Sequence, residues 1–175
     1  MKLITFALLG LMSFLLLTVQ AKANKNSSEP QFTVYLVRHA EKVLTQKNPP
    51  LTPCGIKRAE QLSVMLEQAN IATIYSTEFV RTEQTAAPLA QKLNIPVQSY
   101  SPKDLAGFAK QVKQEKKNTV IVGHSNTTPQ LTSFIANTLV NEITEQEYQM
   151  LYQVQFTGDK AQLTLLKQPL SCEQD

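Results

Sequence analysis

Two short apolar runs, each ending in a histidine, constrain the fold of this chain more than any other feature. They are Val34–His39 and Thr119–His124, and they contain both histidines of the chain. Aliphatic and β-branched runs of this length predict buried strands. In open α/β sheets, the crevice that binds ligands lies at the carboxyl ends of the strands. We therefore expect the two imidazoles at one edge of a sheet, in a single site.

Runs with strand character alternate with runs of helical spacing, which predicts an α/β fold. The expected architecture is a three-layer α/β/α sandwich around a mostly parallel central sheet. The third strand should lie at an edge of the sheet, because Pro96 cannot donate a ladder hydrogen bond. Strands are expected at 32–38, 71–76, from 95 onward and at 120–123, and the later helices at 80–93, 103–115 and 128–137.

The first helix should begin at Thr52-Pro53, with Thr52 as N-cap and Pro53 as the first helical residue. Apolar residues then recur at helical spacing and predict one buried face. These residues are Ile56, Ala59, Leu62, Met65 and Leu66.

The C-terminal region predicts a β-hairpin. Met150–Phe156 and Ala161–Leu166 flank Gly158-Asp159, a dipeptide suited to a tight turn. We therefore expect an antiparallel pair of strands added to the otherwise parallel sheet.

The first 23 residues have the form of an export signal. Met1-Lys2 is positive, residues 3–19 are apolar, and Ala21-Lys22-Ala23 fits a signal peptidase site. The alternative is an uncleaved membrane anchor, since the apolar stretch approaches the roughly 17 to 25 residues of a spanning helix. We expect cleavage, a flexible polar lead-in over 24–31 and one domain over 32–175, in the periplasm or secreted.

Charge and cysteine content narrow the range of partners. The formal net charge of +3 falls to +1 when Lys2 and Lys22 of the signal are subtracted. A net charge this close to zero predicts that the protein has no nucleic-acid partner. Because the signal is expected to be removed, we also expect no stable insertion into the membrane. Cys54 and Cys172 are too few for a zinc cluster and lack metal-ligand spacing. In an exported protein they could form a disulfide or stay unpaired.

A third segment belongs with the two histidine runs. Residues 74–77 end the second expected strand, and Arg81 follows early in the next helix. Arg38, His39, Arg81 and His124 should therefore meet at the same sheet edge. Two guanidinium groups can hold a tetrahedral phosphate through charge-assisted hydrogen bonds while an imidazole attacks it. The alternative is that Arg81 is a solvated surface charge and the histidines are incidental loop residues.

Four segments in order resemble the motifs of the histidine phosphatase superfamily, also called the phosphoglycerate mutase-like family. The resemblance covers roughly residues 32 to 137. Leu36–Glu41 resembles the nucleophile motif, with Ala40 where glycine is often found, and Leu51–Gly55 resembles its Leu-Thr-x-x-Gly element. Ser76–Ala86 resembles the second-arginine segment, and Val122–Asn126 is similar to the second-histidine motif.

The resemblance implies a role for each site residue. His39 would be the nucleophile, forming a covalent phosphohistidine that water later hydrolyses. Arg38 and Arg81 would clamp the phosphoryl oxygens, and His124 would complete the pocket and stabilise charge in the transition state. No metal or other cofactor is required, since the two arginines supply the positive charge.

Several positions depart from the family pattern. Arg58 stands where a glutamine is often found, and Glu78 takes a place frequently occupied by proline. Ser125 follows the second histidine, so the proton donor of the acid phosphatase branch is absent. Glu78 and Asp104 are candidates for the missing donor, although Asp104 looks equally like a helix residue favoured by the dipole. A substrate with a good leaving group would need less help from a donor.

These implications favour an exported, metal-independent phosphatase that hydrolyses phosphomonoesters or phosphoramidates. The chain has little room for large cap insertions, which predicts an open pocket for a small phosphorylated substrate or for a phosphate on a larger carrier. One alternative is a non-catalytic phosphate-binding or envelope-interaction module on the same fold, supported by the missing acid. A phosphoglycerate mutase is disfavoured by the expected compartment and by the short chain.

Overall fold

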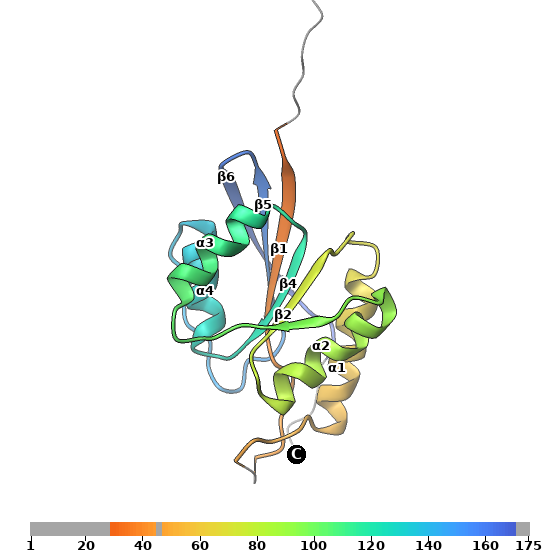
Figure 1. Ribbon diagram of the computed structural model, residues 1–175. Coiled ribbons are helices and arrows are strands. Elements are labelled where there is room, and N and C mark those ends of the chain that lie inside the picture. Colours follow the sequence, from red (N-terminus) through yellow and green to blue (C-terminus); the bar gives the residue numbers. More distant parts are fainter. Residues whose placement is uncertain (1–28, 45–46, 171–175) are drawn as a thin grey trace, which may run out of the picture.

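The computed structural model describes residues 29–44 and 47–170, which form a mixed six-stranded sheet with helices on both faces (Figure 1). The strand order is β3-β2-β4-β1-β5-β6. β1 to β4 run parallel to one another, and β5 and β6 form an antiparallel hairpin beside β1. This confirms the predicted mostly parallel sheet with a C-terminal hairpin. The strands are β1 (Gln31–Arg38), β2 (Thr73–Ser76), β3 (Val97–Ser99), β4 (Thr119–Gly123), β5 (Met150–Thr157) and β6 (Lys160–Lys167).

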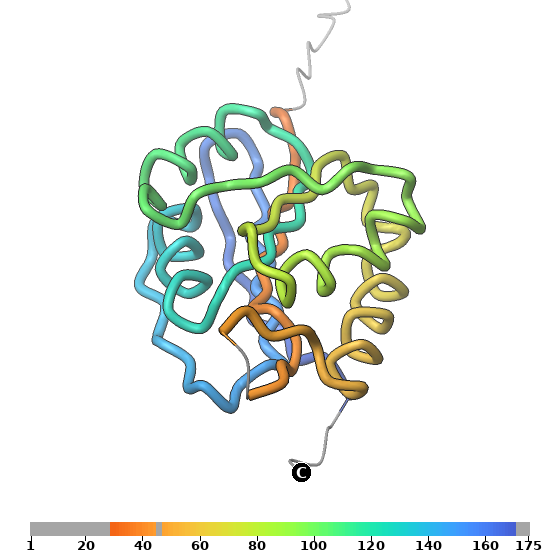
Figure 2. The backbone as a smooth tube through the Cα atoms, turned by 60° about the horizontal axis from the view of Figure 1, so that its bottom comes forward, coloured from red at the N-terminus to blue at the C-terminus, as the bar shows by residue number. Residues whose placement is uncertain are grey.

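Four helices cover the sheet in two pairs, which confirms the three-layer architecture. α1 and α2 pack together on one face, and α3 and α4 pack together on the other (Figures 1 and 2). Side chains of β1 point alternately to the two faces of the sheet. Val34 and Leu36 belong to the hydrophobic core under α3 and α4, and Val37 belongs to the core under α1 and α2. The helices are α1 (Pro53–Leu66), α2 (Val80–Leu93), α3 (Leu105–Glu115) and α4 (Thr127–Ala136).

Three parallel strands end together at one edge of the sheet. Arg38 in β1 lies opposite Gly123 in β4, and Ser76 in β2 lies opposite Val122. The backbone N–H of His39 donates to the carbonyl oxygen of Gly123 at 2.9 Å. The loops that follow β1, β2 and β4 therefore start side by side.

Local sequence signals place most element boundaries. The Thr52 hydroxyl accepts from the Gly55 N–H at 3.1 Å as the N-cap of α1, and α2 spans the predicted range. The third strand lies at the sheet edge as Pro96 predicts, but it begins two residues later than expected, at Val97. Gly158 forms the hairpin turn with a φ of 58°, a left-handed conformation that favours glycine.

The buried face of α1 differs in part from the predicted one. Ile56 and Met65 are 48% and 39% exposed, so their predicted burial is wrong. The helix approaches the loop after β1 through Gly55, where an added Cβ would lie 2.2 Å from the backbone oxygen of Glu41. This close approach fixes the rotation of the helix about its axis. It leaves three of the predicted residues facing inward, namely Ala59, Leu62 and Leu66.

A buried ion pair joins α1 to the loop that carries His39. Arg58 Nε donates to both carboxylate oxygens of Glu41, at 3.0 and 2.9 Å, and Arg58 Nη2 donates to Oε1 at 2.6 Å. The two side chains are 3% and 16% exposed. Arg58, which departs from the family pattern, therefore serves as the partner of Glu41.

Breaking this pair should destabilise the fold. Arg58→Ala leaves the Glu41 carboxylate largely buried without its guanidinium, so we expect a loss of about 3 kcal/mol in the free energy of unfolding. Urea denaturation of the purified protein measures this loss. Lys57→Ala, at an exposed position of the same helix, is the matched control. Equal stabilities of the two variants would contradict a structural role for the pair.

Some predictions concern the ends of the chain. The predicted export signal, residues 1–23, and residues 24–28 of the predicted lead-in lie outside the described residues, whereas Gln31 already pairs with Thr157 in the sheet. Cys54 is disulfide-bonded; the sequence left open whether Cys54 and Cys172 pair, and Cys172 lies outside the described residues. Within the described ranges, no helix has the length and apolar character needed to cross a membrane.

Candidate active site

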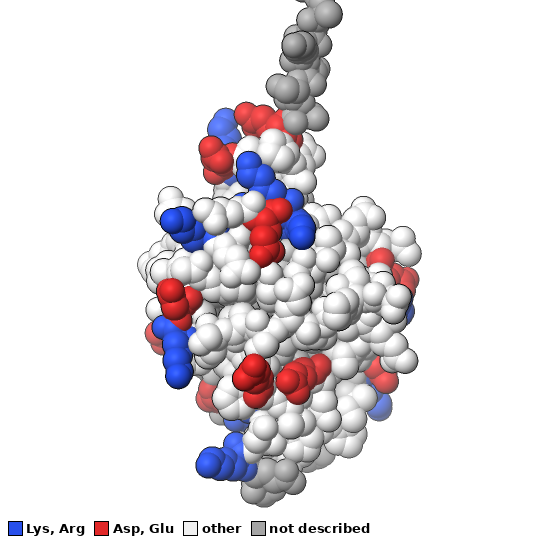
Figure 3. All heavy atoms as spheres, in the orientation of Figure 1, with Lys and Arg blue, Asp and Glu red and all other residues white. Residues whose placement is uncertain are grey.

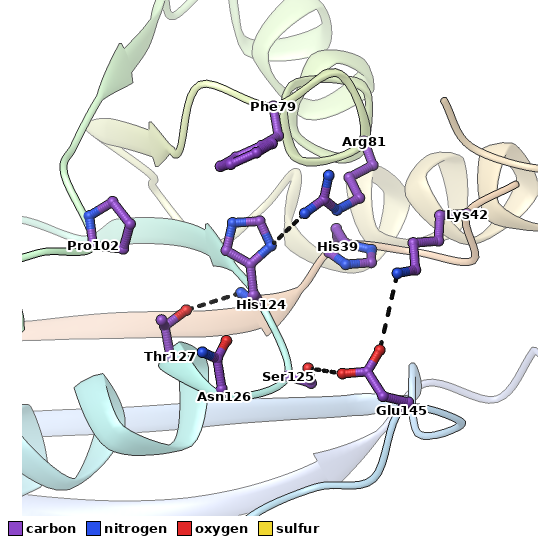
Figure 4. A pocket seen from close by; sticks show the side chains of 10 residues that line it. All are labelled: His39, Lys42, Phe79, Arg81, Pro102, His124, Ser125, Asn126, Thr127 and Glu145. Carbon is purple, nitrogen blue, oxygen red and sulfur yellow. Dashed lines mark hydrogen bonds and ion pairs between the residues drawn. The ribbon is translucent and has the colours of Figure 1, made fainter. Parts of the chain in front are cut away.

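A pocket of about 530 Å³ lies where β1, β2 and β4 end (Figure 4). Three of the four predicted site residues line it, so the structure brings His39, Arg81 and His124 together. The loop before β5 closes one side of the pocket with Glu145. The complete lining is His39, Lys42, Phe79, Arg81, Pro102, His124, Ser125, Asn126, Thr127 and Glu145.

The imidazole of His39 is held in one tautomer. Its Nδ1 lies 2.8 Å from the backbone oxygen of Ala40. Because a carbonyl oxygen can only accept, Nδ1 carries the ring hydrogen and the lone pair is on Nε2. The next peptide is anchored as well, since the Ala40 N–H donates to the Thr85 hydroxyl in α2 at 2.9 Å. His39 is therefore a buried, oriented imidazole with a nucleophilic Nε2.

The surroundings of His39 keep the ring uncharged. Burial lowers the pKa of His39 to about 3, and the positive charges of Arg38 and Arg81 act in the same direction. The hydrogen bond to Ala40 opposes this effect without overcoming it. At neutral pH the imidazole is therefore unprotonated, which is the form that a nucleophile requires.

His124 is oriented by the loop after β2 and by α2. Arg81 Nη2 donates to His124 Nδ1 at 3.3 Å, so Nε2 carries the ring hydrogen and donates to the Thr77 hydroxyl at 2.9 Å. Burial, followed by the charges of Arg81 and other nearby cations, lowers the pKa of His124 to about 4. The ring centroids of His39 and His124 are 5.5 Å apart. Two neutral imidazoles thus face the same pocket.

Arg81 projects into the pocket from the first turn of α2. Its guanidinium lies over the ring of Phe79, with 4.5 Å between the guanidinium carbon and the ring centroid. Its Nε is buried and has no hydrogen-bond partner within the described part of the chain. Arg81 is therefore a pocket cation rather than a solvated surface charge.

Arg38 is held by the loop that precedes β5 and does not line the pocket. Its Nη1 donates to the backbone oxygens of Thr144, Glu145 and Glu147 at 3.1, 2.8 and 3.2 Å. Its Nη2 donates to Glu145 Oε2 at 2.8 Å, and the guanidinium stacks on the Tyr148 ring at 4.0 Å. The structure thus places Arg38 beside the pocket, where it ties this loop to the end of β1.

The two carboxylates suggested by the sequence as proton donors lie elsewhere. Glu78 accepts from the Ser99 hydroxyl at 2.9 Å, and Asp104 caps α3 by accepting from the Gly107 N–H at 2.8 Å. Neither lines the pocket, whereas Glu145 does.

Sequence reasoning missed Glu145 and Lys42. Glu145 lies 107 positions from its partner Arg38, in a loop without helical or strand periodicity, so no local signal identifies it. Lys42 is three residues beyond His39 and could have been identified as a third cation near the nucleophile motif.

The pocket contains two cationic side chains, Lys42 and Arg81, and one carboxylate, Glu145. On the face seen in Figure 3, acidic and basic side chains are interspersed. Within residues 29–44 and 47–170, no group of three or more His, Cys, Asp or Glu side chains could hold a metal ion. The described groups therefore suit an anion, which Arg81, Lys42 and the two histidines can contact.

Comparison with known proteins shows which sequences this chain is similar to. A family model described as the histidine phosphatase superfamily (branch 1) matches residues 34–101. The probable phosphoglycerate mutase GpmB of Proteus mirabilis is 38% identical over 65 residues, which cover 33% of this chain and 30% of that protein. The match thus spans less than a third of that relative.

Solved structures share the fold. The protein histidine phosphatase SixA, complexed with tungstate, has a TM-score of 0.64 at 15% identity, over 78% of this chain and 97% of that one. Phosphoserine phosphatase of Entamoeba histolytica, in complex with 3-phosphoglyceric acid, has a TM-score of 0.57 at 16% identity, over 76% and 95% of the two chains. The chain therefore shares its fold with these phosphatases, and its residues 34–101 match the model of the histidine phosphatase superfamily (branch 1).

Proposed function

We propose that this protein is a metal-independent phosphatase that hydrolyses phosphomonoesters or phosphoramidates through a phosphohistidine at His39. The observation that carries the proposal is the hydrogen bond from His39 Nδ1 to the Ala40 carbonyl. It leaves the Nε2 lone pair available in a pocket that also contains Arg81 and His124. A neutral, oriented imidazole beside cations is the arrangement that attack on phosphorus needs.

The cations supply the electrostatic part of the mechanism. As Nε2 bonds to phosphorus, charge on the equatorial oxygens is stabilised by the Arg81 guanidinium and by the Lys42 ammonium group. Arg38 is proposed to contribute through its charge and through its buried Nε, which has no partner within the described residues. His124 is proposed to bind a phosphoryl oxygen through Nδ1, after protonation in the field of the bound anion.

Water must reach the phosphohistidine for hydrolysis to follow. The side chain of Glu145 is 62% exposed and Phe79 is 37% exposed, so the pocket opens to solvent between them. An open site favours transfer to water over transfer to a second hydroxyl of a retained substrate, which supports a phosphatase over a mutase. It also suits a small phosphorylated substrate or a phosphate on a larger carrier.

A non-catalytic phosphate-binding or envelope-interaction module on the same fold is the second candidate. Turnover of p-nitrophenyl phosphate by the purified protein separates the two, followed by a panel of phosphorylated metabolites to define the substrate. Catalysis supports the phosphatase. Binding of inorganic phosphate without any turnover supports the module.

Activity should survive exhaustive treatment with EDTA. The positive charge that phosphoryl transfer needs comes from side chains, so removal of divalent cations should leave kcat and KM for p-nitrophenyl phosphate unchanged. The measurement compares chelated protein with the same sample after addition of Mg²⁺ or Zn²⁺. Loss of activity that a metal restores would contradict the proposal.

The mature protein is proposed to act in the periplasm or outside the cell. Residues 1–23 have a positive start, an apolar run and a cleavage-site pattern, so we expect the mature chain to start at Asn24. N-terminal sequencing of protein released from the cell envelope tests this. Recovery of the chain from the membrane fraction with Met1 to Ala23 still attached would instead support an anchored form.

A further inference from the structure

The proposed reaction requires a proton donor that the recognised motifs do not supply. When the P–O bond of an alkyl phosphate breaks, the leaving oxygen is a poor leaving group unless it is protonated. Glu78 and Asp104 are engaged outside the pocket. Among the described residues that line the pocket, Glu145 is the one carboxylate.

Glu145 reaches the pocket from the loop before β5 and contacts groups on two other segments. Its Oε2 accepts from Arg38 Nη2 at 2.8 Å and lies 4.0 Å from Lys42 Nζ. Its Oε1 accepts a hydrogen bond from the Ser125 hydroxyl, directly after His124. Figure 4 shows the carboxylate on the opposite side of the pocket from Phe79 and Arg81.

These contacts keep Glu145 ionised while the pocket holds no anion. The hydrogen bond from Ser125 lowers the pKa of Glu145 most, and the charges of Arg38 and Lys42 lower it further. A bound phosphoryl group changes this balance, since its negative charge draws on the same cations and raises the pKa of a neighbouring carboxyl group. The charged or titratable groups around Glu145 are Arg38, Lys42, Arg81, His124 and Tyr148.

We propose that Glu145 is the proton donor to the leaving-group oxygen and the base that then activates water. The inference rests on the proposed phosphatase function. Glu145 takes up a proton from solvent when the substrate binds, because the phosphoryl oxygens compete for Lys42 and Ser125, which line the pocket, and place negative charge beside the carboxylate.

The two steps balance in protons and bonds. In the first, His39 Nε2 forms the N–P bond, the P–O bond to the leaving group breaks, and the carboxyl proton of Glu145 passes to the leaving oxygen. In the second, water forms a new P–O bond, the N–P bond breaks, and the Glu145 carboxylate takes a proton from the water. Alcohol and inorganic phosphate are released, and as the phosphate leaves, Glu145 returns to solvent the proton that it took up when the substrate bound.

Glu145→Gln tests the proposal with little change in shape. The amide oxygen can still accept from one of the two donors, Arg38 or Ser125, and the three backbone carbonyls that hold Arg38 are untouched. Glu142→Gln removes the same charge from an exposed position of the same loop and is the matched control. Thermal unfolding of both variants verifies that they are folded.

Two substrates separate proton donation from other roles. For glycerol 2-phosphate, whose alkoxide needs a proton, Glu145→Gln should lower kcat/KM on the order of a hundredfold or more. For p-nitrophenyl phosphate, whose phenolate leaves unprotonated, kcat/KM should fall less than about tenfold, because kcat/KM reports the steps up to loss of the phenolate, and these need no proton. Glu145→Asp should recover part of the lost activity, and Glu142→Gln should behave as the wild type.

Three outcomes overturn the assignment. Equal losses on both substrates show that Glu145 only positions Arg38. If Glu145→Gln is more active than the wild type on both substrates, the carboxylate merely competes with phosphate for the cations. Equal rates of wild type and Glu145→Gln on the alkyl phosphate show that no proton is donated. By contrast, a wild type that neither turns over p-nitrophenyl phosphate nor forms a phosphohistidine shows that the proposed function itself is wrong.

Discussion

Replacing His39 with alanine is expected to abolish both turnover and the covalent intermediate. The change removes the Nε2 lone pair that would attack phosphorus. The other described imidazole of the pocket cannot replace it, because His124 Nε2 carries a hydrogen and donates it to the Thr77 hydroxyl. Loss of a nucleophile lowers kcat on the order of 10⁴-fold or more. The variant should therefore retain no more than background hydrolysis of p-nitrophenyl phosphate.

The intermediate itself provides the direct measurement. Wild-type protein quenched under conditions that preserve acid-labile phosphate should carry one phosphate per chain, located by mass spectrometry on the peptide that contains His39. His39→Ala should carry none, whereas Lys57→Ala, at an exposed position of α1, should label as the wild type does. Phosphate on any residue other than His39 would overturn the assignment of the nucleophile.

Arg81→Ala is expected to produce the second largest loss. The change removes a guanidinium that faces the pocket and donates to His124 at 3.3 Å, so it weakens charge stabilisation and loosens the orientation of the second imidazole. We expect kcat/KM to fall on the order of a hundredfold or more. Steady-state kinetics with p-nitrophenyl phosphate measure the change.

A conservative variant separates charge from geometry at this position. Arg81→Lys keeps a positive charge but lacks the planar fork that can contact two phosphoryl oxygens at once, so it should recover only part of the activity. Near-normal kcat/KM in both variants would mean that Arg81 does not contact the phosphoryl group.

The sequence alone determines the layers of this fold and the edge at which its site forms. Fully apolar runs such as Thr119–Gly123 can be buried on both faces only in a sheet covered by helices on both sides. Thr52-Pro53 starts α1 through contacts with residues nearby in the chain, so this boundary can also be predicted locally. Parallel strands end at the same edge, which is why His39, Arg81 and His124 could be assigned to one pocket before the structure was known.

Only the tertiary structure decides how side chains from distant segments pair. The rotation of α1 depends on the close approach of Gly55 to Glu41, and the partner of Arg58 lies 17 positions away. No periodicity of the helix encodes either contact.

The same limit applies to the loop before β5, where Glu145 meets a partner 107 positions away. The loop has no repeating pattern, and its position follows from the three backbone carbonyls and the carboxylate that Arg38 binds. Local sequence patterns indicate which residues form a helix or a strand. A contact between two loops depends instead on the positions of the strand ends from which the loops start, and these are set by the whole sheet. For that reason His39 could be proposed as the nucleophile from the sequence, whereas the carboxylate of Glu145 could not be found there.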